Sequence, residues 1–322
     1  MRRLLCLILF VASPLHAEAP RVATDIAPVH SLVAQVMQGV GEPDLVIPPG
    51  ASPHGYAMRP SEARALGAAD LVVWVGPALT PWLEEPLDSL APHARRLSLM
   101  EGQGLTLLPF REGAAWEDAH DHGHDDHGHD DHAHEKHEHG HDHGHSETHH
   151  GYADPHLWLD PVNGAQALAL IAGALADADP ENADRYHANA RAGQDRLAAL
   201  TQELAATLEP VSGRPFIVFH DAFHYFEARF GIEARGAVSA GDAAEPGAAR
   251  ISELRAHLAK TEAKCAFSEP QMNVGVLETV IEGQGTRVAV LDPLGSSLPL
   301  GPDLYPDLLG ALAATMVSCL QG

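Results

Sequence analysis

Apolar residues recur along most of the chain in two alternating patterns. Short continuous runs such as residues 71–75 are typical of strands buried on both faces, and longer runs with helical spacing such as residues 29–40 predict amphipathic helices. The pattern predicts strands at residues 21–26, 43–47, 71–75, 95–99, 216–219, 233–237, 265–268 and 287–291. It predicts helices at residues 29–40, 61–68, 77–90, 221–230, 246–261, 274–282 and 304–320. This alternation favours parallel sheets covered by helices.

A long helical pattern separates the two groups of strands. It covers residues 161–208 and is interrupted at Asp179-Pro180, where Pro180 suits the start of a second helix. That second helix, residues 181–208, would be about 42 Å long, enough to run along two domains. We therefore predict an α/β fold of two parallel-sheet lobes, residues 20–180 and 210–322, joined by a linking helix at residues 181–209. A ligand cleft is expected between the lobes, at the carboxyl ends of the strands.

The hydrophobic pattern is absent from residues 117–151, which are expected to form a disordered loop without a core. Fourteen of the 23 histidines lie in this loop, mostly as His-x-His pairs separated by Asp and Gly. Imidazole is a nitrogen ligand that suits zinc, copper and nickel, and many weak sites on one tether raise the local metal concentration. An inert solvated linker is the alternative interpretation. The predicted weak metal ligands are His120, His122, His124, His127, His129, His132, His134, His137, His139, His141, His143, His145, His149 and His150.

Charge and the N-terminus narrow the class of protein. The formal net charge is −24, and the loop contributes eleven acidic residues against one lysine, Lys136. The rest of the chain is moderately acidic without a basic patch, which argues against nucleic acid and against an anionic membrane surface as partners. Arg2 and Arg3, the apolar residues 4–12 and the small residues around Ala17 and Ala19 are typical of a cleaved export signal at residues 1–19. The mature protein is expected to be soluble and exported.

Two cysteines, Cys265 and Cys319, remain after removal of the signal, which carries Cys6. In an oxidising compartment a single pair is most simply a disulfide, which would join the last helix to a strand of the second lobe. Zinc-ligating thiolates are the alternative, which their apolar surroundings disfavour.

Three histidines outside the loop lie where the cleft is expected. His54 follows a predicted strand among turn residues, His156 follows the loop, and His220 ends the strand at residues 216–219. One histidine at such a place is more often structural, but three at strand ends in both lobes complete most of a tetrahedral metal site. Asp292, after the last predicted strand, is a candidate fourth ligand.

At these residues the chain resembles the periplasmic zinc-binding proteins of high-affinity zinc ABC uptake systems (the ZnuA type), over nearly the whole mature length. The resemblance implies two α/β lobes bridged by a rigid helix, an acidic His-rich loop and a disulfide near the C-terminus. It places the metal ligands at His54, His156 and His220, in a protein expected to be a periplasmic monomer. The matching motifs are Gly50-Ala-Ser-Pro-His54, Pro155-His-Leu-Trp-Leu159, Val218-Phe-His-Asp-Ala222, Phe267-Ser-Glu-Pro270 and Leu291-Asp-Pro-Leu-Gly295.

One position departs from part of that family. Some members have Glu directly before the first ligand histidine, where this chain has Pro53. The fourth ligand is then water, a loop histidine or Asp292, which matches the carboxylate ligand of related members and which we favour. Glu269 is a candidate hydrogen-bond acceptor for a ligand histidine, although a structural role is an equal alternative. His224 is interpreted as lining the cleft or as exposed.

The leading functional hypothesis is a binding protein without enzymatic activity that captures zinc and delivers it to an inner-membrane ABC permease. Zinc is then the transported ligand. Manganese is the alternative cargo, although a site dominated by histidine suits zinc better. A zinc hydrolase is a second alternative, but no general base or nucleophile motif accompanies the histidines. A stand-alone metal buffer that relies on the loop is the third.

Overall fold

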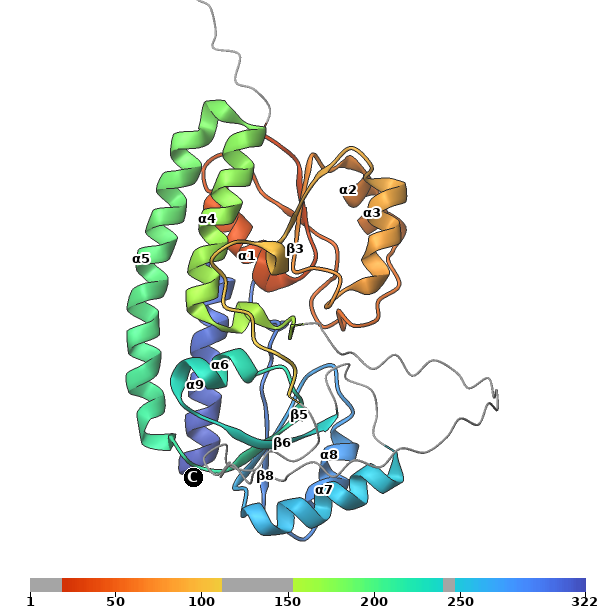
Figure 1. Cartoon of the computed structure of the whole chain (residues 1–322), viewed down its shortest axis with the longest axis vertical. Coiled ribbons are helices and arrows are strands. Elements are labelled where there is room, and N and C mark those ends of the chain that lie inside the picture. Colours follow the sequence, from red (N-terminus) through yellow and green to blue (C-terminus); the bar gives the residue numbers. More distant parts are fainter. Residues whose placement is uncertain (1–18, 112–152, 240–246) are drawn as a thin grey trace, which may run out of the picture.

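The computed structural model describes residues 19–111, 153–239 and 247–322, which form two α/β lobes stacked along the longest axis of the molecule (Figure 1). The predicted signal, apart from Ala19, lies outside the described residues. So does the predicted His-rich loop at residues 117–151, with all fourteen of its histidines. Among the described residues, no helix combines the length and the apolar character needed to cross a membrane.

The N-terminal lobe is built on a parallel four-stranded sheet in the order β2-β1-β3-β4. Its strands are β1 (Val22–Thr24), β2 (Asp44–Leu45), β3 (Leu71–Trp74) and β4 (Arg95–Ser98). Its helices are α1 (Ala27–Val36), α2 (Pro60–Ala68) and α3 (Glu84–Leu90), with the 3-10 helices η1 (Pro81–Leu83) and η2 (Leu99–Glu101). All of β3 is buried, as expected of a central apolar strand covered on both faces.

The C-terminal lobe repeats this arrangement with a parallel sheet in the order β6-β5-β7-β8. Its strands are β5 (Phe216–His220), β6 (Ala234–Ser239), β7 (Cys265–Ser268) and β8 (Arg287–Val290). Its helices are α6 (His224–Phe230), α7 (Ala248–Thr261), α8 (Val274–Ile281) and α9 (Leu304–Gln321). In each lobe the first strand in sequence, β1 or β5, lies inside the sheet, with a neighbouring strand on each side. The connections to these neighbours therefore run in opposite directions, and this reversal opens a crevice at the carboxyl end of the first strand.

Helices between the two groups of strands connect the lobes. They are η3 (Leu157–Leu159), α4 (Pro161–Ala178), η4 (Pro180–Asn182), α5 (Ala183–Leu208) and η5 (Glu209–Val211). The 26 residues of α5 extend about 39 Å and run beside both lobes, packed against α1, α4 and α9 (Figure 1). The predicted long helix is therefore present, and it begins after a 3-10 turn at Pro180.

The main hydrophobic core is shared by the two lobes. One connected set of buried side chains includes Val73 of the first sheet, Trp158 between the lobes, and Phe216 of the second sheet. A smaller set, with Ile217 and Leu277, lies between the second sheet and α7 and α8. Because interiors are close-packed, a shared core holds residues of both lobes in a fixed relation.

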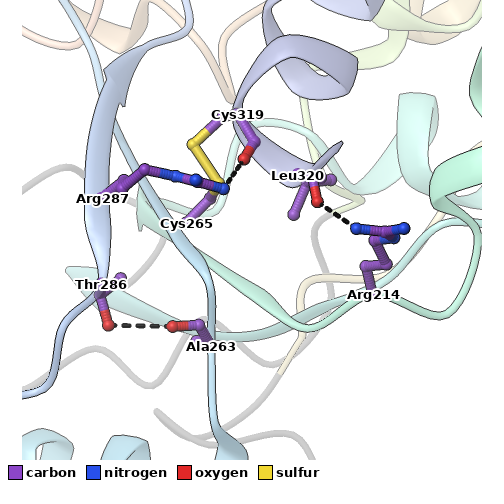
Figure 2. Close-up of a disulfide and its surroundings, with 7 residues drawn as sticks. All are labelled: Arg214, Ala263, Cys265, Thr286, Arg287, Cys319 and Leu320. Atoms are coloured by element: carbon purple, nitrogen blue, oxygen red, sulfur yellow. Dashed lines mark hydrogen bonds between the residues drawn. A yellow bond between two sulfur atoms is a disulfide. The ribbon is translucent and has the colours of Figure 1, made fainter. Parts of the chain in front are cut away.

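A disulfide ties the end of α9 to β7 (Figure 2). It joins Cys265 to Cys319, as predicted, and excludes both sulfur atoms as thiolate ligands. Two arginines hold the same chain end, because Arg287 donates to the carbonyl oxygen of Cys319 and Arg214 donates to that of Leu320 at 2.6 Å (Figure 2).

Two predicted helices begin later than expected. The helix at residues 77–90 is α-helical only from Glu84, because Pro81 forces Thr80 out of the helical conformation, at φ −127° and ψ 64°. The helix at residues 221–230 begins at His224, after a turn in which Ala222 N donates to His220 O. His220 and His224 therefore do not lie on one helix.

Candidate metal centre

Three histidines from separate parts of the chain meet between the lobes. His220 ends β5, His54 lies in the loop between β2 and α2, and His156 directly precedes η3. One ring nitrogen of each lies within 4.8 Å of those of the other two. His156 and His220 are almost fully buried, at 1% and 2% exposed, whereas His54 is half-buried. When histidine, cysteine, aspartate and glutamate side chains of the described residues are considered, these three histidines are the group close enough to hold a metal ion.

Two buried carboxylates orient two of the rings. His156 Nδ1 lies 2.7 Å from Asp154 Oδ1, and His220 Nδ1 lies 2.8 Å from Glu269 Oε1. An ionised carboxylate only accepts hydrogen bonds, so each Nδ1 carries the proton and each Nε2 keeps its lone pair. The two Nε2 atoms face each other at 3.2 Å. Two nitrogen ligands at about 2.0–2.1 Å from a tetrahedral zinc ion stand about 3.3 Å apart, which fits this spacing.

The fold places Glu269 and His220 at the crevice of the second sheet. β5 and β7 are neighbouring parallel strands, and their carboxyl ends carry His220 and, one residue beyond β7, Glu269. The candidate role of Glu269 as acceptor for a ligand histidine therefore has its contact in the structure. Asp154 has the same relation to His156, whose backbone N–H it also binds at 3.0 Å. The role of Asp154 was not predicted, although Asp154 stands directly before the quoted motif that begins at Pro155.

The pKa values of the two buried rings move in opposite directions. Burial lowers the pKa of His156 well below its ordinary 6.5, and the neighbouring His220 lowers it further. Burial also lowers the pKa of His220, but the charge and hydrogen bond of Glu269, with the charges of Asp221 and Asp154, together outweigh burial, and the pKa lies above 6.5. Burial raises the pKa of Asp154 to about 7. The two rings, His156 and His220, therefore do not both carry a second proton. Their arrangement favours a single cation held between the two Nε2 atoms.

The third histidine is held by its loop. Trp82 Nε1 donates to Pro53 O at 2.8 Å, and Tyr56 donates to Glu62 of α2 at 2.9 Å. The His54 ring centroid lies 5.2 Å from that of His220 and 5.6 Å from that of His156. The loop therefore delivers a ligand from the N-terminal lobe to the two buried histidines.

The histidines line a cavity of about 10 Å³. This is close to the smallest volume that holds one water molecule. Its other walls are mainly apolar or neutral, and include Trp158, Met272, Pro293 and Leu294. A space of this size suits a single ion.

Asp292 and His224 do not join the three histidines. The Asp292 carboxylate accepts hydrogen bonds from Leu294 N at 3.0 Å and from Ser296 N and Oγ at 2.6 Å, so it holds the turn after β8. His224 Nδ1 lies 3.8 Å from Asp154 Oδ2, behind His156. Gln271, which sequence reasoning missed, does line the cavity.

Two parallel-sheet lobes with a buried histidine cluster between them place the protein in the class of two-lobed metal-binding proteins. A family model described as "ZnuA: Zinc-uptake complex component A periplasmic" matches residues 22–319, so the chain belongs to this family. The membership confirms the expected periplasmic, non-enzymatic component of a zinc-uptake complex.

Relatives match at nearly full length. The chain is 46% identical to the high-affinity zinc uptake system protein ZnuA of Brucella suis biovar 1, over 97% of this chain and 95% of that protein. It is 44% identical to the protein of the same name from Paracoccus denitrificans, over 96% and 94%. A solved structure titled "Crystal structure of ZnuA" superposes with a TM-score of 0.73 at 23% identity, covering 94% of this chain and 99% of that one.

The fold alone does not determine the metal. The structure of the binding protein FpvC from Pseudomonas aeruginosa in complex with Mn²⁺ superposes with a TM-score of 0.74 at 22% identity, covering 94% of this chain and 98% of that one. The donor atoms of the site must therefore decide between zinc and manganese.

Proposed function

We propose that the protein captures one zinc ion with His54, His156 and His220 and delivers it to the permease of an ABC importer. The observation that carries the proposal is the pair of buried Nε2 atoms that face each other at 3.2 Å, each oriented by a carboxylate on its other nitrogen. The relatives from Brucella and Paracoccus are named as high-affinity zinc uptake proteins. The export signal at residues 1–19 would bring the mature chain to the periplasm.

Zinc is favoured over manganese by the donor set. Three neutral imidazoles suit zinc, whereas manganese prefers sites rich in carboxylate oxygen. Asp154 and Glu269 bind the ligand rings, and Asp292 binds its own turn, so the described donor atoms that face one another are those of the three imidazoles. For the fourth position of the ion, the candidates are water, a histidine of the loop and Asp292.

The site also suits carriage of an ion better than catalysis. A zinc hydrolase needs space beside the metal for its substrate, and the cavity holds about 10 Å³. A stand-alone buffer would not need a preorganised site whose rings are fixed by buried carboxylates.

Removal of the three ligands tests the proposal. Replacing His54, His156 and His220 together with Ala should abolish the tightest zinc site, measured by competition with a chelator. The control is replacement of the exposed His93 and His187, which should leave that site unchanged. Retention of the tightest site by the triple variant would refute the assignment.

A further inference from the structure

The Tyr225 hydroxyl joins α6 of the C-terminal lobe to the chain segment that carries His156. Tyr225 is the second residue of α6 and is 2% exposed. Its hydroxyl donates to Asp154 O at 2.7 Å and accepts a hydrogen bond from Leu108 N at 2.9 Å. Asp154 N in turn donates to Leu108 O at 2.8 Å. The described flanks on both sides of the His-rich segment therefore meet one buried hydroxyl.

The direction of the Tyr225 O–H bond follows from its two partners. A phenol has one hydrogen, and Leu108 N is already a donor to the phenol oxygen, so the hydrogen points to Asp154 O. Burial raises the pKa of Tyr225 above its ordinary value of 10, and the charges of Asp154 and Asp160 raise it further, against the opposing effect of Leu108 N. The hydroxyl therefore keeps its proton and remains a donor to Asp154 O.

The Asp154 carboxylate needs this anchor. Its Oδ1 accepts hydrogen bonds from His156 Nδ1 at 2.7 Å and from His156 N at 3.0 Å. Its Oδ2 has no hydrogen-bond partner among the described residues. The hydrogen bonds of the carboxylate thus go to His156 alone and cannot fix the pair relative to the rest of the protein. The backbone of Asp154, bound to Tyr225 and Leu108, supplies the connection.

Tyr225 is also close to His220 along the chain. β5 ends at His220, and Ala222 N donates to His220 O at 2.9 Å in the turn that leads into α6. We propose that Tyr225 is a positioning residue, which acts through Asp154 to set the separation of the ring nitrogens of His156 and His220. This inference rests on the proposed function, because it requires both rings to bind the ion.

The separation of these nitrogens has to be held by the protein. When neither Nε2 carries a proton, the lone pairs of the His156 and His220 rings repel each other across 3.2 Å. Without the Tyr225 hydroxyl the His156 ring can move away, and zinc has to draw it back at the expense of affinity. Loss of an outer hydrogen-bond partner of a metal ligand typically lowers metal affinity by about 10–100-fold.

Tyr225→Phe in the full chain tests this role, because it removes the hydroxyl and keeps the ring. Contacts on the other side of His156 remain, since Trp158 Nε1 donates to Pro293 O at 2.8 Å. Zinc affinity of the tightest site is measured by chelator competition. The visible absorption spectrum of bound Co²⁺ reports the geometry of the ligands, and urea unfolding of the metal-free protein reports stability.

The matched control is Tyr186→Phe. Tyr186 is fully buried, and its hydroxyl donates to Asp179 Oδ2 at 2.8 Å. Neither of these two residues lines the metal cavity. The control therefore loses a buried tyrosine hydrogen bond away from the site, and it separates a loss of stability from a change in the position of the ligands.

Tyr225→Phe should weaken zinc binding by about tenfold and change the Co²⁺ spectrum. Tyr186→Phe should leave both properties at the wild-type value, whatever its effect on unfolding. The inference is overturned if Tyr225→Phe keeps the wild-type affinity and spectrum, or if the control changes them equally. Failure of the three-histidine site would instead appear as tight binding retained by the triple histidine variant, so the two failures are distinguishable.

A double-mutant cycle tests the route through Asp154. In an Asp154→Ala background the carboxylate that orients His156 is absent, so Tyr225→Phe should weaken zinc binding less than it does in the wild type. An equal loss of affinity in both backgrounds would show that Tyr225 does not act through Asp154.

Discussion

The Nε2 atoms of His156 and His220 face each other at 3.2 Å in the interior of the protein. Both atoms are acceptors when each Nδ1 donates to its carboxylate, so their lone pairs repel unless a cation lies between them. A proton relieves this repulsion for one ring, and a metal ion relieves it for both. Protons and zinc therefore compete for the same position.

Zinc affinity should fall with decreasing pH, beginning above the ordinary histidine range. Burial lowers the pKa of His220, but the charge and hydrogen bond of Glu269 together with the charges of Asp221 and Asp154 raise it above 6.5, so the metal-free site takes up a proton that zinc must displace. The pKa of His156 is lowered by burial, and that ring stays neutral over the same range. Affinity should decrease about tenfold per pH unit below the pKa of His220, measured by chelator competition between about pH 5.5 and 8.5.

The control for this effect is Glu269→Gln, which removes the main cause of the raised pKa. The onset of the decrease should then move to lower pH, while zinc affinity at high pH weakens by about tenfold or more because the ring is less well oriented. A pH profile identical to that of the wild type would show that His220 does not carry the competing proton.

Arg111 should be a major contributor to stability. Its guanidinium binds Asp221, which follows His220, and Glu227 of α6 at 2.7 Å. Both carboxylates are almost fully buried, at 5% and 2% exposed. Arg111→Met would leave two carboxylates near each other without the cation and should lower the free energy of unfolding by about 3–5 kcal/mol. Urea unfolding of the metal-free protein measures the change.

The matched control for Arg111 is Arg196→Met. Arg196 binds Asp303 at 2.6 Å, but the two side chains are 47% and 68% exposed. Exposed ion pairs contribute at most about 1 kcal/mol, so this variant should be close to wild type. Equal effects of the two substitutions would contradict the importance of burial for the Arg111 contacts.

The His-rich segment should be dispensable for the tight site. On its two sides, Pro109 and Ala153 form an antiparallel bridge and Asp154 N donates to Leu108 O at 2.8 Å, so the described flanks already lie together. Replacing residues 120–150 with a short Gly/Ser linker should lower the number of bound zinc ions and slow capture from scarce metal. Stopped-flow capture and equilibrium dialysis measure these quantities. Loss of the tightest site would show that the segment supplies an essential ligand.

Much of the fold was predictable because its signals are local. Continuous apolar runs identified the strands, for example Cys265–Ser268 with both ends correct. Asp179-Pro180 marked the break between α4 and α5. His54, His156 and His220 were predictable as one group because each lies at a strand or loop end where parallel sheets open a crevice, and because the surrounding motifs resemble a known family.

What remained unpredicted depends on contacts between distant residues. The hydrogen bonds that the Asp292 carboxylate accepts from Leu294 and Ser296 depend on the turn after β8, and no sequence pattern indicates them. The partners of Arg111 are more than a hundred positions away in sequence. Gln271 carries no metal signature by residue type, and its place on the cavity wall follows from the turn after β7.

The disulfide should stabilise the folded protein considerably. Cys265 and Cys319 are separated by 54 positions, and closure of a loop of this size restricts the unfolded chain by about 4 kcal/mol. The double variant Cys265→Ala and Cys319→Ala should have a free energy of unfolding lower by about 4 kcal/mol and should therefore unfold at a lower urea concentration. Wild-type protein kept under reducing conditions should behave like the variant. Equal free energies of unfolding for the oxidised wild type and the variant would contradict the expectation.

Asp25 should make the metal-free protein less stable as pH rises towards neutrality. Burial raises the pKa of this fully buried carboxyl to about 7, although its oxygen atoms accept hydrogen bonds from Ile26 N and Val75 N, both at 2.8 Å. In the unfolded chain the pKa returns to about 3.8. Between these two values the folded protein binds a proton that the unfolded chain has released, so the free energy of unfolding decreases as pH increases.

The expected decrease from this one group is about 2 kcal/mol between about pH 5 and pH 7, and it levels off above the folded pKa. Asp25→Asn cannot titrate, so its free energy of unfolding should change less over the same range. Urea unfolding at several pH values, with a chelator present to exclude zinc, gives both profiles. Other groups, Asp154 and His220 included, titrate in both proteins and cancel in the difference between the profiles. Parallel profiles for wild type and Asp25→Asn would show that Asp25 remains charged in the folded protein across this range, held so by the two backbone N–H groups.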